Sequence, residues 1–200
     1  MPGGNWFILI AIALAVVFFG TRVAKALSRS MAERRSAMEP LNAAELKIGQ
    51  KLELVGKFDK AAIAYQQMID KYPKAEIGYL FLGYLKRKTG DNKAAAEAFR
   101  GALLVSPGSA TAMEELALSL KASGDIEGAC ELFRKVIDAE PGNTSVHGEL
   151  GLGLFSLGDR DGALKALEGF EKLSGDKLRG RAKAVSEEAM KILGELRATR

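Results

Sequence analysis

The stretch GDNKAAAEAF, residues 90–99, decides how this chain folds, because the same arrangement recurs along the sequence. Related stretches begin at Gly56, Gly90, Gly124 and Gly158, so the copies follow one another at a constant step of 34. In each copy an alanine stands five positions after the glycine, and a bulky aromatic or aliphatic side chain stands nine positions after it. A small set of residue types held at fixed spacing indicates one structural unit that is built several times.

Other classes of position keep the same period and the same phase. Prolines recur at a step of 34, and so do small residues ahead of each glycine: Pro73, Pro107 and Pro141, and Gly49, Gly83, Ala117 and Gly151. Generic amphipathic helices would share the short spacing of a helical turn but would not keep one phase from copy to copy. The sequence therefore predicts a repeat array.

Each unit resembles the tetratricopeptide repeat, a helix–turn–helix whose length is the same as the step seen here. The second unit matches most fully, at Tyr79, Leu82, Gly83, Gly90, Ala95, Phe99, Ala102 and Pro107. The resemblance implies an all-α solenoid of four repeats, 42–75, 76–109, 110–143 and 144–177. The fourth unit departs from the pattern, because Gly175 stands where a proline is expected.

The small residues have a physical reason within this interpretation. Two antiparallel helices that cross closely need little side-chain volume at the crossing, which Gly83 and Ala95 provide. Phe99 is then expected to fill the space where the helices diverge. Gly90 suits a left-handed residue at the end of the first helix, and Pro107 ends the second.

The segment 178–197 follows the last repeat and carries one apolar stripe at helical spacing. We expect it to form a capping helix that covers the end of the array, because no repeat buries its apolar face alone. The alternative is a helix that docks onto a partner or lies in the groove of a neighbouring molecule.

The N-terminal segment predicts a membrane helix. Residues 6–19 form an apolar run without a break, and no charged side chain precedes Arg22. Residues 5–24 would span about 30 Å as a helix, which matches a bilayer core. Residues 25–41 would form a basic juxtamembrane linker. A buried core helix and a signal peptide cleaved after Ala26 remain as alternatives.

The charge of the chain is concentrated beside this segment. Residues 1–38 hold five basic residues against one acid, so they carry the whole net charge of +4. The positive-inside rule then places the repeats on the cytoplasmic side, with a bacterial inner membrane favoured by the composition and the periplasmic side still open. The nearly neutral remainder lacks the excess basic charge typical of nucleic-acid binding, so no nucleic-acid partner is predicted.

In the resembled family the first helices line a concave groove that binds peptides. The resemblance implies these groove residues here: Leu46, Gln50, Leu54, Ile77, Leu80, Tyr84, Arg87, Lys88, Leu118, Lys121, Leu152 and Phe155. The apolar members suit an amphipathic helix or an extended peptide of a protein partner, and the three bases would add a rim for acidic residues. Some of these side chains could instead belong to the core between helices.

One known specificity of the family is not predicted. Members that clamp the C-terminal carboxylate of chaperones use basic and amide side chains on the first and third units. Leu46 and Gln50 stand at the first pair of positions here, and Glu114 and Leu118 stand at the second. Glu114 would repel a carboxylate.

No residue pattern predicts catalysis, a metal site or a cofactor. His147 and Cys130 are single residues at repeat positions that usually serve packing, and the glycines form no phosphate-binding loop. The sequence therefore predicts a membrane-anchored adaptor or scaffold that binds a protein partner. The alternatives are a self-assembling structural protein, hence a homo-oligomer, or an exported periplasmic repeat protein.

Overall fold

The computed structural model describes residues 44–175, 178 and 180–199, which form helices joined by short loops. The first described helix covers residues 44–54, and the others follow in antiparallel order. They are α2 Phe58–Lys71, α3 Glu76–Lys88, α4 Asn92–Val105, α5 Ala110–Ala122, α6 Ile126–Ala139, α7 Thr144–Ser156, α8 Arg160–Leu173 and α9 Gly180–Ala198. The expected membrane helix and basic linker, residues 5–24 and 25–41, lie outside the described residues.

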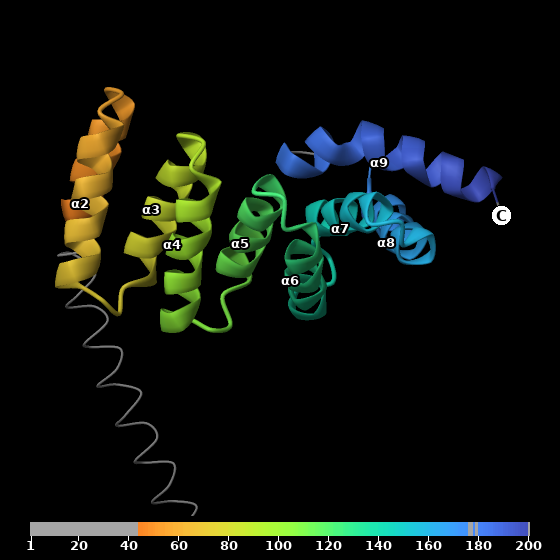
Figure 1. Ribbon diagram of the computed structural model, residues 1–200, viewed down its shortest axis with the longest axis horizontal. Helices are drawn as coiled ribbons and strands as arrows, with labels where there is room; N and C mark the ends of the chain where they lie inside the picture. Colours follow the sequence, from red (N-terminus) through yellow and green to blue (C-terminus); the bar gives the residue numbers. More distant parts are fainter. Residues whose placement is uncertain (1–43, 176–177, 179, 200) are drawn as a thin grey trace, which may run out of the picture. The chain divides into compact units, whose positions relative to one another are not determined.

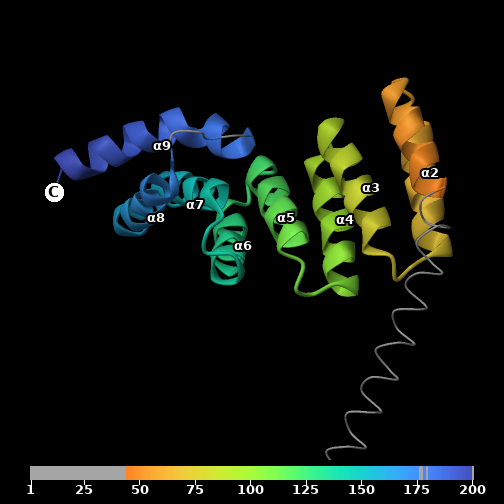
Figure 2. The same ribbon diagram turned by 180° about the vertical axis from the view of Figure 1, so that it is seen from behind.

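The chain divides after residue 45, and residues 46–200 form the second unit, which is compact. Within the second unit consecutive helices pack against each other as the predicted solenoid, with α3 beside α4, α5 beside α6 and α7 beside α8 (Figures 1 and 2). The all-α repeat architecture predicted from the constant step of the sequence is confirmed. No helix among the described residues combines the length and the apolar character that a membrane crossing needs.

The crossing within a repeat is built as the small residues predict. A methyl group added at Gly83 of α3 would lie 2.5 Å from Cε1 of Phe99 on α4, so the ring rests directly on the glycine. Phe99 and Ala95 are completely buried. The same arrangement recurs in the fourth repeat, where Gly151 lies against Leu167. Close helix crossing therefore explains why the sequence places glycine and alanine before a bulky residue.

The loop between paired helices is fixed by two neighbouring residues. Gly90 adopts a φ of +84°, the left-handed conformation that glycine reaches without strain. Asp91 then caps the N-terminus of α4, and its carboxylate accepts a hydrogen bond of 3.1 Å from the backbone N–H of Ala94. Asp125 and Asp159 occupy the equivalent positions of the next two repeats, and they cap α6 and α8 in the same way.

Most buried side chains form one cluster that runs from α4 to α9. It includes the large residues Phe99, Phe133, Leu167 and Phe170, all completely buried. A smaller cluster of Ala61, Tyr65 and Leu85 joins the first repeat to α3. The main core is thus continuous from the second repeat to α9, as expected for units that cannot bury their apolar faces alone.

Candidate partner-binding groove

The predicted groove residues lie on the first helices of the four repeats. Leu46, Gln50 and Leu54 are on the 44–54 helix, Ile77, Leu80, Tyr84, Arg87 and Lys88 on α3, Leu118 and Lys121 on α5, and Leu152 and Phe155 on α7. Their exposure varies widely. Leu54 is 86% exposed, whereas Leu152 is only 9% exposed and belongs to the core. Leu80, Tyr84, Leu118 and Phe155 are half-buried, with one side packed against the core.

Tyr84 is held in place by two neighbouring aromatic rings. Its ring meets Phe99 edge to face, with 5.5 Å between the centroids, and meets Phe81 in the same way at 6.0 Å. Burial raises the pKa of the Tyr84 hydroxyl, and the nearby Glu115 adds to this effect while Arg87 opposes it. The hydroxyl therefore loses its proton less readily than that of a free tyrosine.

The three predicted rim bases are paired with glutamates of adjacent first helices. Arg87 of α3 lies 2.8 Å from Glu115 of α5, and Lys121 of α5 lies 2.8 Å from Glu149 of α7. Both partners of the second pair stand one repeat after those of the first, so the two pairs form the same tie between successive repeats. Lys88 of α3 lies 3.4 Å from Glu53 on the 44–54 helix, so it pairs with the preceding repeat and not with the following one.

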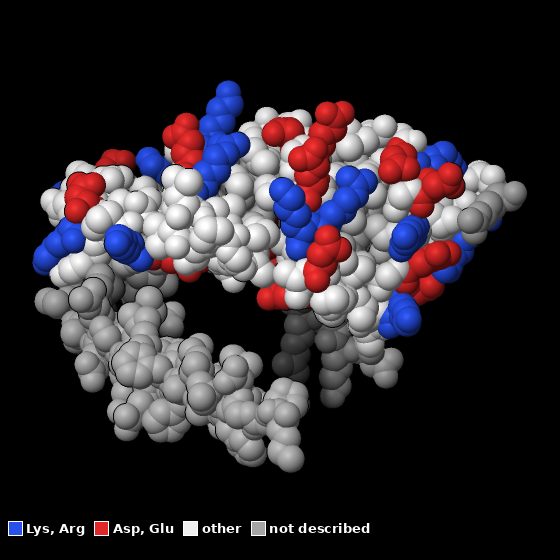
Figure 3. Space-filling view, turned by 90° about the horizontal axis from the view of Figure 1, so that it is seen from below, with Lys and Arg blue, Asp and Glu red and all other residues white. Residues whose placement is uncertain are grey.

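This pairing changes the electrostatics expected from the sequence. Each base is already paired with a carboxylate of the same molecule. The rim therefore attracts an acidic partner less strongly than three unpaired bases would. The sequence analysis did not predict a role for Glu115 and Glu149. The two glutamates are 34 residues apart, as are Arg87 and Lys121, and this shared spacing could have indicated the pairing. On the face shown in Figure 3, basic and acidic side chains likewise lie interspersed.

Helix α9 packs on α7 and α8, and α7 is one of the helices that carry predicted groove residues. Figures 1 and 2 both show it running over α7, with its first turn near α5. A methyl group added at Gly148 of α7 would lie 2.8 Å from Cγ2 of Val185, so α9 contacts α7 one helical turn before Leu152, a predicted groove residue. The capping role predicted for this segment did not include a position along the groove.

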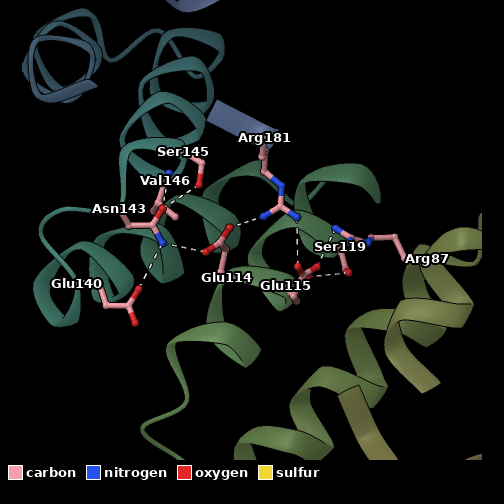
Figure 4. A network of polar contacts seen from close by, with 9 residues as sticks. All are labelled: Arg87, Glu114, Glu115, Ser119, Glu140, Asn143, Ser145, Val146 and Arg181. Carbon is pink, nitrogen blue, oxygen red and sulfur yellow. Dashed lines mark hydrogen bonds and ion pairs between the residues drawn. The ribbon is translucent and has the colours of Figure 1, made fainter. Parts of the chain in front are cut away.

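Arg181 in the first turn of α9 joins this helix to α5. Its guanidinium donates hydrogen bonds to Glu114, and to Glu115 at 3.2 Å (Figure 4). Glu114 also accepts a hydrogen bond of 3.0 Å from the side-chain amide of Asn143. The glutamate that would repel a chaperone carboxylate is thus bound to an arginine that is distant in sequence.

Cys130 and His147, the single cysteine and histidine of the chain, both pack against glycines of neighbouring helices. Cys130 is 1% exposed, with its sulfur against Gly153, and burial raises the pKa of its thiol. The ring of His147 packs on Gly169, and its Nε2 lies 3.1 Å from the carbonyl oxygen of Pro141. Two repeats earlier, Tyr79 makes the corresponding contacts with Gly101 and Pro73. The described residues contain no group of His, Cys, Asp or Glu that could hold a metal ion.

Comparisons with known proteins agree on the fold. Two family models described as tetratricopeptide repeat match residues 22–75 and 80–144. No curated protein is significantly similar to the chain in sequence. A crystal structure of MamA protein shares 22% identity over 78% of this chain and 89% of that one, with a TM-score of 0.65.

Two further solved structures have the same fold at similar distance. MamA 41-end from Desulfovibrio magneticus RS-1 is 20% identical over 66% of this chain and 73% of that one, with a TM-score of 0.56. The first TPR of Spaghetti (RPAP3), bound to the HSP90 peptide SRMEEVD, is 19% identical over 58% of this chain and 93% of that one, with a TM-score of 0.55. At such identities the likeness concerns the fold alone.

Proposed function

We propose that this chain, which carries tetratricopeptide repeats, is a membrane-anchored scaffold that holds a helix or an extended segment of a partner protein in its groove. The repeats make it a protein-interaction scaffold of the tetratricopeptide type. The observation that carries the groove assignment is the half-exposed apolar surface of α3. Ile77, Leu80 and Tyr84 lie there side by side at helical spacing, and none of them is fully buried.

The anchor is proposed from the sequence of residues 5–24. Its length suits one crossing of a bilayer, and the basic residues that follow favour a cytoplasmic location for the repeats. The intact mass of the chain isolated from its native membrane tests this part. A mature chain that begins at Leu27 would show that the segment is cleaved and would replace the anchor with an exported form.

The groove is tested by photo-crosslinking in native membranes. A photoreactive amino acid replaces Tyr84, and the crosslinked products are identified by mass spectrometry. The matched control carries the same group at Leu104 of α4, which is 86% exposed on a second helix. A partner captured from position 84 and not from position 104 supports the proposal.

Two other results would contradict it. Equal capture from both positions would mean that contact is not specific to the groove. Capture of another copy of this chain from position 84 would favour the self-assembling structural protein, because the groove would then be filled by its own kind.

A further inference from the structure

The two halves of α9 are attached to the repeats in different ways. In the second half Ala189, Ile192, Leu193 and Leu196 are buried in the main core. In the first half, residues 180–188, no side chain is fully buried, and Lys183, Ala184, Glu187 and Glu188 are exposed. The first half is held by the partly buried Ala182 and Val185, which pack against the core, and by Arg181 against α5. It therefore has far less apolar contact to lose if it separates.

The first half follows a row of equivalent groove positions. Leu46, Leu80, Glu114 and Gly148 occupy the same position in the four repeats, and we call them the groove row. Val185 contacts the row at Gly148, and Arg181 contacts it at Glu114. Since residues four apart lie on one face of a helix, α9 presents both side chains to the row at once.

The surface under α9 has the chemistry to select an arginine. Glu114 and Glu115 are adjacent in sequence, and both accept hydrogen bonds from the one guanidinium of Arg181. Without that group, Glu115 keeps Arg87 and Glu114 keeps only the neutral amide of Asn143. A planar guanidinium that reaches two carboxylates suits this site better than the single ammonium of a lysine.

We propose that the surface of α5 and α7 under α9 is a binding site for an amphipathic helix that carries an arginine and, four positions later, a small aliphatic residue. In this structure the first half of α9 fills the site from within the same chain, and a partner helix of that kind displaces it. The inference rests on the proposed function in one respect, that the natural occupant is a helix of a protein partner.

The test uses the full chain and a synthetic fluorescein-labelled peptide of residues 180–198 as the probe. A disulfide between Gly148→Cys and Val185→Cys locks α9 on the groove row, where the added Cβ of residue 148 would lie 2.8 Å from the valine methyl. Cys130 is the sole native cysteine and is buried, so it does not compete. Fluorescence anisotropy then compares peptide binding to the oxidised and reduced forms of one protein.

We expect the peptide to bind the reduced form at least about tenfold more tightly, because the tethered helix competes at a high effective concentration and the locked one cannot leave. Arg181→Ala in the chain, which weakens the internal helix and leaves the probe intact, tightens binding further. The matched control is Arg197→Ala, which removes an exposed ion pair with Glu171 at the other end of α9 and leaves binding at the wild-type value.

Equal binding to the oxidised and reduced forms would overturn the inference, and so would a probe that binds as well after its own Arg181 is changed to Glu. No binding to the Arg181→Ala chain would also overturn it. This assay needs no natural partner, so it can succeed where crosslinking at position 84 captures nothing, which would reject the proposed function alone. Partner capture with a probe that never binds would reject the inference alone.

Discussion

Gly83→Ala should destabilise the second repeat, although the same substitution normally strengthens a helix. An alanine in a helix interior is more favourable than glycine by about 1 kcal/mol. At Gly83, however, the new methyl group would lie 2.5, 2.6 and 2.8 Å from three ring atoms of Phe99. The ring is completely buried and packs against Tyr84, so it can move only together with its neighbours.

The net effect follows from these two contributions. Overpacking of a well-packed core costs about 1–3 kcal/mol, and the gain in helix propensity offsets about 1 kcal/mol of it. We expect a net loss of about 1 kcal/mol, which would speed amide hydrogen exchange in α3 and α4 about fivefold. Hydrogen exchange read by mass spectrometry on the full chain measures this effect repeat by repeat.

The matched control is Gly194→Ala in α9. Gly194 is also helical, but it is exposed, and an added methyl group would meet nothing within 4 Å. Only the propensity contribution of about 1 kcal/mol remains there, so exchange in α9 should slow about fivefold. Slower exchange in both variants would refute the reasoning, because it would show that the α3–α4 crossing adapts to the methyl group at no cost.

The third repeat shows why this outcome is not trivial. Ala117 occupies the position equivalent to Gly83, and both Ala117 and Phe133 are completely buried. A crossing with one more methyl group is therefore possible when the two helices are positioned for it. The cost at Gly83 is the cost of moving α3 and α4 toward such a crossing while both remain packed on neighbouring repeats.

Three further predictions concern single residues. Cys130, buried and with a raised pKa, should react with iodoacetamide at pH 8 at least about tenfold more slowly in the native chain than in urea, and equal rates would contradict its burial. Burial and a 2.7 Å hydrogen bond to Glu53 raise the pKa of Tyr65, so the folded chain holds this proton above about pH 10, where the unfolded chain releases it. The free energy of unfolding should therefore fall as the pH rises past 10, and Tyr65→Phe should reduce that fall in urea titrations at pH 9 and 11. Gly124→Ala should lower the free energy of unfolding in urea by about 1–2 kcal/mol, because Gly124 has a φ of +94°. Gly108 lies in open space and has no left-handed φ, so Gly108→Ala should change that free energy by less than about 0.5 kcal/mol.

The sequence predicted the repeats well because their signals are local or strictly periodic. A helix crossing needs a small residue at one position of each partner, and Gly83 and Ala95 show this directly. The left-handed loop needs a glycine, and each copy of the pattern supplies one, as Gly90 does in the second repeat. Such requirements are met within a single repeat, so one unit of sequence carries them in full.

The groove was predicted less completely, because its character depends on pairs of residues from different repeats. Arg87 looked like a free cation, since the carboxylate that pairs with it, Glu115, belongs to the next repeat. The same is true of Lys121 and Glu149. Spacing predicts which side chains face the groove, but only the distance between neighbouring helices decides which of them pair.

Two residues at the contact of α9 with the repeats are unfavourable within their own helices. Arg181 stands in the first turn of a helix, where the backbone dipole disfavours a positive charge, and no acid in that turn offsets it. Gly148 stands in a helix interior at a position where the earlier repeats carry Leu46, Leu80 and Glu114. Each residue is costly within its own helix and is explained by a contact with another one, Arg181 with Glu114 and Gly148 with Val185. Helix periodicity could not connect them, because it shows which face of α9 is apolar and not which surface that face covers. Residues that are unfavourable within their own helix are expected where the sequence serves a function besides folding. Here both such residues, Arg181 and Gly148, lie at the contact between α9 and the groove row.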